Sequence, residues 1–99
     1  MTLRIAWSRE AEDDLLQIWG YLAREASIPR ADDQIQKIEQ ACRRLSDWPL
    51  SGRARDFLIP GMRSIVVAPY LIFYRVLGDS VQIVRVLHGH RDVEAMFTD

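Results

Sequence analysis

The chain has 99 residues, of which 48% are hydrophobic and 27% are charged. This length fits one domain over residues 1–99, and the composition excludes the disordered class of protein. The formal net charge is −1. With so little net charge and few arginines, we expect no direct DNA binding by this chain alone.

The charge is nevertheless segregated along the chain. Residues 1–48 carry nine acidic and seven basic side chains (−2), residues 49–91 carry two and six (+4), and residues 92–99 carry three and none (−3). The cations of the second half are all arginines. Arginine is the side chain suited to binding phosphate or carboxylate with a fixed fork, so the second half is a candidate anion or nucleic-acid surface.

Cysteine content and hydropathy predict the compartment. No apolar run approaches the ~20 residues that span a bilayer, and the N-terminus has no signal-peptide pattern. The single Cys42 excludes an intramolecular disulfide framework. We therefore expect a cytoplasmic protein without membrane contact, in which Cys42 is a buried small hydrophobe.

The first half predicts a short strand followed by two helices. Leu3–Trp7 alternates in the manner of a strand. Ser8 is placed as the N-cap of an amphipathic helix that reaches about Glu25. Ser27-Ile28-Pro29 breaks this helix, and Pro29 can open a second one that reaches about Trp48. Two helices joined by so short a break predict an antiparallel hairpin.

The second half predicts short strands separated by turn signals. The expected strands are Asp56–Ile59, Met62–Val67, Tyr70–Leu77 and Ser80–His88. Gly78-Asp79 between the last two is the signal of a two-residue type II′ hairpin. The fold class is therefore α+β: a short N-terminal strand and an antiparallel helical hairpin packed on a small antiparallel β-sheet.

Five ordered motifs carry a family resemblance. They are Trp7…Ala11…Asp14-Leu15…Ile18…Tyr21-Leu22, Leu45…Pro49…Gly52-Arg53, Leu58-Ile59-Pro60-Gly61-Met62-Arg63, Tyr70…Ile72-Phe73-Tyr74-Arg75 and Val84-Arg85-Val86-Leu87-His88-Gly89-His90-Arg91-Asp92. Together they resemble the ParE-type toxins of bacterial toxin–antitoxin systems, within the RelE/ParE superfamily. The resemblance covers nearly the whole chain and implies the same fold.

The resemblance also implies a function and partners. It implies a type II toxin that poisons DNA gyrase and forms a hetero-oligomer with a cognate, ParD-like antitoxin, which would carry the DNA-binding domain at its own N-terminus. The alternative within the superfamily is a RelE-like, ribosome-dependent mRNA endoribonuclease. A third interpretation is an inactive relic that still binds antitoxin.

The candidate target-binding residues lie in the second half: Arg63, Arg75, Arg85, His88, His90 and Arg91. In the ribonuclease alternative, Arg63, Arg85, His88 and His90 would be catalytic, because RNA cleavage needs a base, an acid and cations. The lysine cluster and near-terminal tyrosine of RelE-type ribonucleases have no match here, since Lys37 is the only lysine and lies in the helical hairpin. This favours action by binding, without intrinsic catalysis. The alternative for the arginines is pairing with hairpin acids or a solvated face, and for the histidines a turn with local hydrogen bonds.

The candidate antitoxin-binding residues are apolar or aromatic: Leu15, Trp19, Leu22, Ile35, Tyr70 and Tyr74. For Tyr70 and Tyr74, which share a strand face, a core position is the other interpretation. The acidic residues Glu10, Glu12, Asp13, Asp14, Asp32 and Asp33 are interpreted as helix-start charges. No cofactor motif or metal-ligand set is present in the sequence, so neither a cofactor nor a metal is expected.

Overall fold

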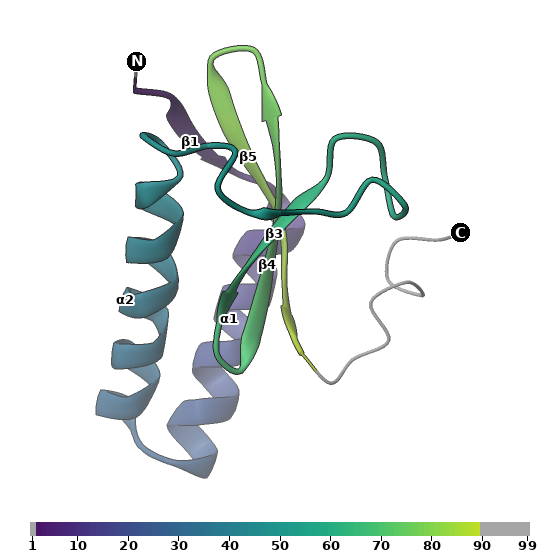
Figure 1. The fold of residues 1–99 in the computed structure, drawn as a ribbon. Coiled ribbons are helices and arrows are strands. Elements are labelled where there is room, and N and C mark those ends of the chain that lie inside the picture. The colour runs from purple at the N-terminus through teal and green to yellow at the C-terminus, as the bar shows by residue number, and fades with distance from the viewer. Residues whose placement is uncertain (1, 90–99) are drawn as a thin grey trace.

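The computed structural model describes residues 2–89. Two helices cover one face of a five-stranded sheet (Figure 1). The elements in chain order are β1 (Arg4–Trp7), α1 (Arg9–Glu25), α2 (Ile28–Arg44), β2 (Arg53–Ala54), β3 (Arg63–Val67), β4 (Tyr70–Leu77) and β5 (Ser80–His88). The predicted α+β class and the antiparallel hairpin are confirmed.

The first helix begins after its predicted N-cap, Ser8, whereas the second begins at Ile28, one residue before the predicted start at Pro29, and has Ser27 as its N-cap. The Ser8 hydroxyl accepts a hydrogen bond from the Ala11 amide at 3.0 Å, and the Ser27 hydroxyl accepts one from the Arg30 amide at 3.2 Å. The predicted end of the second helix at Trp48 is wrong, since α2 ends at Arg44. The next residues form tight turns, in which the Leu45 amide donates to the Cys42 carbonyl at 3.0 Å.

The sheet has the strand order β1-β5-β4-β3-β2. The strands from β2 to β5 are antiparallel to their neighbours, as predicted, whereas β1 pairs with β5 in parallel. The sheet is therefore mixed, which corrects the prediction of a purely antiparallel one. The parallel pairing arises because the helical hairpin carries the chain back between β1 and the rest of the sheet.

The predicted strand over Asp56–Ile59 is also wrong. These residues form a turn instead, in which the Asp56 carboxylate accepts a hydrogen bond from the Gly61 amide at 2.9 Å. The strand of this region is the two-residue β2, opposite Arg63 and Ser64. The predicted Gly78-Asp79 turn is present, and Gly78 alone of the two has a positive φ, of 59°, as a type II′ turn requires.

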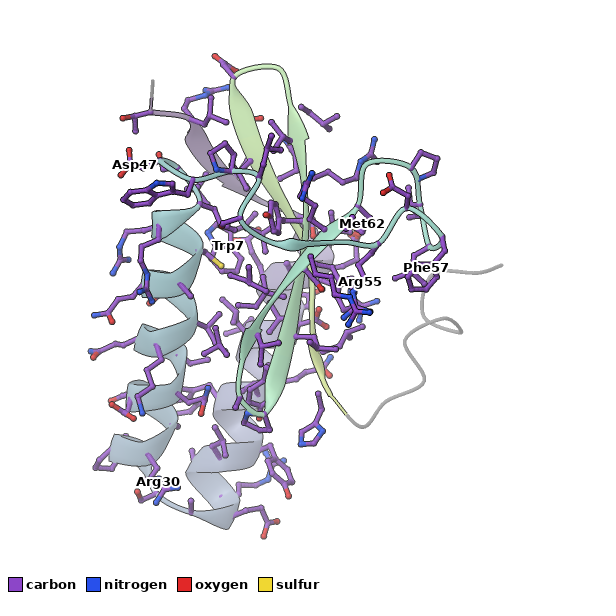
Figure 2. The ribbon with its side chains drawn as sticks, in the orientation of Figure 1. Trp7, Arg30, Asp47, Arg55, Phe57 and Met62 are labelled. Carbon is purple, nitrogen blue, oxygen red and sulfur yellow. The ribbon has the colours of Figure 1, made fainter. Side chains whose placement is uncertain are left out.

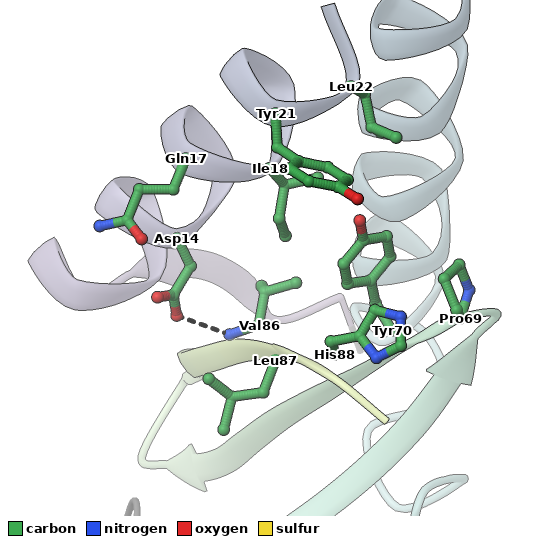
Figure 3. A pocket seen from close by; sticks show the side chains of 10 residues that line it. All are labelled: Asp14, Gln17, Ile18, Tyr21, Leu22, Pro69, Tyr70, Val86, Leu87 and His88. Carbon is green, nitrogen blue, oxygen red and sulfur yellow. Dashed lines mark hydrogen bonds between the residues drawn. The ribbon is translucent and has the colours of Figure 1, made fainter. Parts of the chain in front are cut away.

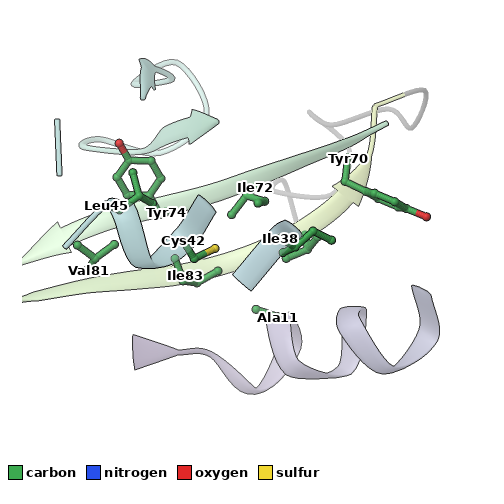
Figure 4. Packing of buried hydrophobic residues seen from close by; sticks show 10 residues of the cluster. Ala11, Ile38, Cys42, Leu45, Tyr70, Ile72, Tyr74, Val81 and Ile83 are labelled. Atoms are coloured by element: carbon green, nitrogen blue, oxygen red, sulfur yellow. The ribbon is translucent and has the colours of Figure 1, made fainter. Parts of the chain in front are cut away.

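The core has two parts on opposite faces of the sheet. The larger part lies between the sheet and the helices and includes Ile38, Cys42, Ile72, Tyr74 and Ile83 (Figure 4). Cys42 is fully buried there, as predicted. The smaller part lies on the other face and joins the buried side chains of Met62, Phe73 and Leu87. Residues 58 and 59 cover it, so the segment after β2 forms a partial second layer.

Candidate functional site

The predicted target residue Arg85 is held by an acid of α1. Its guanidinium donates to the two carboxylate oxygens of Asp14 at 2.8 and 2.9 Å, and the Val86 amide donates to the same carboxylate at 2.9 Å. The hydrogen bonds to Asp14 raise the pKa of Arg85 above its ordinary value. Arg85 therefore joins β5 to α1, and its guanidinium binds a carboxylate of the protein itself.

The predicted target residue Arg63 has a similar internal role. Its guanidinium donates to the carbonyl of Gly52 at 2.8 Å and to that of Leu50 at 3.2 Å. The buried Tyr74 hydroxyl holds the same loop, because it donates to the Pro49 carbonyl at 2.7 Å and accepts from the Gly52 amide at 2.9 Å. Both side chains therefore fix the chain between α2 and β2.

Arg75 differs from these two arginines. It lies on β4 opposite Gln82 and is half-buried, and its Nε has no hydrogen-bond partner in the structure. Arg55, which is not among the predicted target residues, donates from its Nε to the Ser64 hydroxyl at 2.9 Å. Figure 2 shows Arg55 on the side of the sheet away from the helices. Strand alternation places Arg75 on the same face as Phe73, which also packs away from the helices.

His88 lies in a pocket between α1 and the ends of the central strands (Figure 3). The pocket has a volume of about 400 Å³, and its walls include Asp14, Tyr21, Tyr70 and His88. The rings of Tyr70 and His88 meet edge to face with centroids 5.6 Å apart. Burial raises the pKa of Tyr70 above its ordinary value, and the nearby Tyr21 adds to the effect. The pocket is therefore mainly aromatic and apolar.

Three of the six predicted antitoxin-binding residues meet in one groove. Leu15, Trp19 and Ile35 line a groove of about 320 Å³ between the two helices, together with Glu12 and Leu16. The Trp19 indole donates to the Asp32 carboxylate at 2.8 Å, which holds the ring across the hairpin. Leu22 and Tyr70 lie apart from this groove and line the pocket of Figure 3.

The structure corrects the prediction that Tyr74 belongs to the antitoxin-binding surface. Its side chain is fully buried in the core, and its hydroxyl is used by the loop before β2. It therefore presents no surface to a partner in this structure. The predicted target residues His90 and Arg91 lie outside the described residues.

The residue that the sequence interpretation missed is Asp14. The sequence predicts a helix-start charge at this position, but the Asp14 side chain is buried and accepts three hydrogen bonds. Its position gave a signal, because it lies three residues after Ala11 and four before Ile18 and so falls on the apolar face of the helix. An acid on such a face requires a partner.

Two observations bear on the kind of chemistry available in residues 2–89. Within this range, no three side chains of His, Cys, Asp or Glu are grouped as ligands of a metal ion. In the same range, neither helix has the length and apolar character required to cross a membrane.

Comparison with known proteins identifies the family. The family model of the ParE toxin of the type II toxin–antitoxin system parDE matches residues 5–93. The chain belongs to the ParE toxin family. Among ParE relatives, toxin ParE3 of Caulobacter vibrioides is 33% identical over 92 residues, which cover 93% of this chain and 92% of that protein. Toxin ParE1 of Mycobacterium tuberculosis is 32% identical over 95 residues, with 95% and 97% coverage.

Solved structures share this ParE fold. A chain of the chromosomal ParDE toxin–antitoxin system from P. aeruginosa superimposes with a TM-score of 0.78 and 25% identity, covering 88% of this chain and 96% of that one. A chain of the RelBE2 toxin–antitoxin complex from Mycobacterium tuberculosis gives a TM-score of 0.60 and 24% identity, with 89% and 99% coverage. The second similarity shows the fold alone.

Proposed function

We propose that this ParE-family toxin acts by binding DNA gyrase and stabilising cleaved DNA, and that a cognate antitoxin neutralises it. The single observation that carries a binding mechanism is the internal use of Arg63 and Arg85. Both would be needed as free cations in the ribonuclease alternative, to stabilise the charge of the transition state. Arg63 is held by two loop carbonyls and Arg85 by Asp14.

The target surface we propose centres on the face of the sheet away from the helices. Arg75 and Arg55 supply positive charge there, and the guanidinium of Arg75, whose Nε is buried without a hydrogen-bond partner, belongs to a residue that is partly exposed. His88, at the end of β5, extends this surface to the helix side of the sheet, where it lines the pocket beside α1, and His90 and Arg91 follow it in the chain. Arg63 and Arg85 support this surface by fixing the loop before β2 and the strand β5.

The antitoxin surface we propose is the groove between α1 and α2. Its lining is almost entirely apolar apart from Glu12, and Leu16, which lines it, is 72% exposed. An exposed apolar groove of this kind on a small domain fits the apolar face of an amphipathic helix. The ParDE system of P. aeruginosa supports a ParD-like partner, which would hold the DNA-binding domain of the complex.

Expression of the chain in cells without its antitoxin tests this function. We expect growth arrest with induction of the SOS response to DNA damage, and both effects should disappear when the antitoxin is expressed as well. Arrest without an SOS response, accompanied by mRNA cleavage at ribosomes, would support the RelE-like alternative. No arrest at all would support the inactive relic.

A further inference from the structure

Most of the positive charge in the second half of the chain has no counter-charge inside the protein. Residues 49–89 contain five arginines: Arg53, Arg55, Arg63, Arg75 and Arg85. Arg63 and Arg85 bind groups of the protein itself. The other three form no ion pair with any carboxylate of residues 2–89. These three cations are therefore available to an anion from outside.

Arg53 and Arg75 lie on the face of the sheet away from the helices. Arg53 is opposite Ser64 in the pairing of β2 with β3, and Ser64 is opposite Phe73, which packs on that face. Residues directly opposite each other share a face, so Arg53 lies on this one. Arg75 follows Phe73 by two residues along β4 and therefore has the same direction.

Arg55 and Arg75 flank Met62 on this face. The Arg55 amide donates to the Met62 carbonyl at 2.7 Å, which places residue 55 beside residue 62. Arg63 is opposite Tyr74, so continuing the antiparallel register places Met62 beside Arg75. Neighbouring strands lie about 4.8 Å apart, which puts the two arginine backbones about 10 Å apart. Their long side chains can reach one phosphate group between them or two neighbouring ones.

The guanidinium groups are placed to receive an anion. Arg55 is oriented by Ser64, whose hydroxyl accepts from its Nε at 2.9 Å. The Nε of Arg75 is buried without a hydrogen-bond partner, although the residue is partly exposed. A poorly solvated cation of this kind gains from an anion at its outer nitrogens. The adjacent acid, Asp56, is engaged with the Gly61 amide at 2.9 Å.

An exposed aromatic ring lies beside these arginines. Phe57, in the loop between β2 and β3, is 67% exposed, whereas the next residues, Leu58 and Ile59, pack on the outer core. The Leu58 amide donates to the Arg55 carbonyl at 2.9 Å, which holds this loop in a turn. Figure 2 shows Arg55 and Phe57 on the same side of the sheet. Proteins bind single nucleic-acid strands with such a pairing, in which cations hold phosphates and a ring stacks on a base.

We propose that this arginine face, formed by Arg53, Arg55, Arg75 and Phe57, binds a strand of the DNA that gyrase has cleaved. The arginines bind phosphates, whose geometry the guanidinium fork matches, and Phe57 stacks on a base. The inference rests on the proposed function, since gyrase supplies the cleaved DNA. A contact made only with the cleaved strand would stabilise the cleaved state.

The small number of cations fits a contact made within the gyrase complex. Three phosphate contacts give little affinity for DNA at physiological salt, which agrees with the expectation that the chain alone does not bind DNA. Once the toxin is bound to gyrase, the DNA lies at a high effective concentration, and weak contacts of this kind then suffice.

Salt dependence tests the face on the free toxin. The probe is a labelled single-stranded oligothymidylate of about ten nucleotides, followed by fluorescence anisotropy at low salt. The logarithm of the association constant should fall against that of the salt concentration with a slope of about −2, since each phosphate contact contributes about −0.7. Arg53→Gln should reduce the slope by about 0.7, whereas Arg53→Lys should keep it. Arg30→Gln, at an exposed arginine of α2, is the control and should change nothing.

Photocrosslinking tests the contact in the complex with gyrase. The DNA carries 5-iodouracil at the gyrase cleavage site, a base that bonds to a stacked aromatic ring on irradiation. We expect a toxin–DNA adduct that peptide mapping assigns to Phe57 and that Phe57→Leu lowers by about fivefold or more. Trp48→Leu is the matched control, because Trp48 is a loop residue of similar exposure, 65%. Calorimetry of toxin with gyrase in the absence of DNA should give affinities within about threefold for Phe57→Leu and the wild type.

The contrary outcomes separate this contact from the proposed function. A toxin that traps cleaved DNA but forms no adduct at Phe57, or a salt slope that Arg53→Gln leaves unchanged, would overturn the DNA contact and leave the gyrase target intact. A loss of gyrase affinity of about tenfold for Phe57→Leu without DNA would overturn it in favour of an acidic surface of gyrase. A wild-type chain that arrests growth but neither binds gyrase nor traps cleaved DNA would contradict the proposed function, and the DNA contact with it.

Discussion

Asp14 and Arg85 form the polar link between α1 and β5. The Arg85 guanidinium contacts both oxygens of the Asp14 carboxylate at 2.8 and 2.9 Å, and the Asp14 and Arg85 side chains are only 10% and 21% exposed. The Val86 amide donates a hydrogen bond to the same carboxylate. Val86 lies on β5 after Ile83, the last residue of this strand that pairs with β1. One acid thus satisfies a buried cation and a buried strand amide together.

The substitution Asp14→Asn should destabilise the fold strongly. It leaves Arg85 without its charged partner in a poorly solvated position, which we expect to cost about 2–3 kcal/mol of unfolding free energy. Urea unfolding followed by circular dichroism measures this. The matched control is Asp79→Asn, because Asp79 pairs with Arg4 at 3.8 Å and both side chains are about 80% exposed, so its effect should stay below about 0.5 kcal/mol. Equal effects of the two variants would contradict the role of Asp14.

Two glycine substitutions should have opposite effects on stability. Gly52→Ala places a methyl group against the Tyr74 hydroxyl and a backbone carbonyl, so we expect a loss of about 2–4 kcal/mol. Gly20→Ala lies within α1, where the nearest atom to the new methyl group is 3.5 Å away. It should stabilise the protein by about 0.5–1 kcal/mol through helix propensity. Thermal unfolding of both variants tests the pair, and a neutral Gly52→Ala would refute the described loop packing.

The protein should lose stability in alkaline solution. Burial raises the pKa of Cys42 from 9.0 to about 12, and burial also raises the pKa of Tyr74. The folded state therefore keeps protons that the unfolded state releases above about pH 9, so the free energy of unfolding falls as pH rises from there. The contribution of these groups is complete below pH 9. Urea unfolding between pH 8 and 11 measures the slope.

The matched variant for this pH dependence is Cys42→Ala. It should be less stable at neutral pH because a buried sulfur is lost, but its stability should fall less steeply with pH near pH 9–10. An identical slope in the variant and the wild type would contradict the burial of a protonated thiol. The thiol of the folded wild type should also react slowly with alkylating reagents at pH 8, since the thiolate is the reactive form.

The sequence predicts the regular elements well where local chemistry decides them. Ser8 predicts the start of the first helix, Pro29 predicts the start of the second to within one residue, and Gly78 predicts the last hairpin. The errors occur where a distant contact decides the structure. Asp56 to Ile59 are good strand formers apart from the acid, but that acid closes a turn with Gly61. The parallel pairing of β1 with β5 joins residues far apart in the chain, and no local pattern reports it.

The site was less predictable than the fold, because residue type does not reveal a partner. Arg63, Arg75 and Arg85 look alike in the sequence as single arginines on strands. In the structure, Arg63 binds loop carbonyls and Arg85 binds a buried carboxylate, whereas the buried Nε of Arg75 has no hydrogen-bond partner. The acid that distinguishes Arg85 lies 71 residues away, on α1. The partner that each arginine binds is therefore determined by the tertiary fold, not by the local sequence.

This difference between the arginines predicts different effects on the target. Arg75→Gln should weaken inhibition of gyrase, by about fivefold or more, without a large loss of stability, because the lost charge would serve the target and not the fold. Arg4→Gln is the matched control, since Arg4 is an exposed strand arginine on β1, an edge strand that lies two strands away from β4. Curves of gyrase inhibition against toxin concentration compare the two variants, and equal potency would remove Arg75 from the proposed target surface.

The helical groove predicts a separate effect on the antitoxin. Leu16→Asp places a charge beside the groove at an exposed position, so the antitoxin should bind at least tenfold more weakly while the toxin stays folded and active. Leu77→Asp, at the exposed end of β4, introduces the same charge away from the groove and should leave binding unchanged. Calorimetry on the two variants is the measurement. If both bind normally, the antitoxin does not use this groove.

The most direct test of the central claim is a gyrase assay with the purified toxin, relaxed and supercoiled plasmid, and ATP. The account predicts loss of supercoiling together with trapped double-strand cleavage, seen as linear DNA that disappears when the antitoxin is added. Normal supercoiling and no linear DNA at a large excess of toxin that still arrests growth would contradict gyrase as the target. That result would favour the alternative function, cleavage of ribosome-bound mRNA.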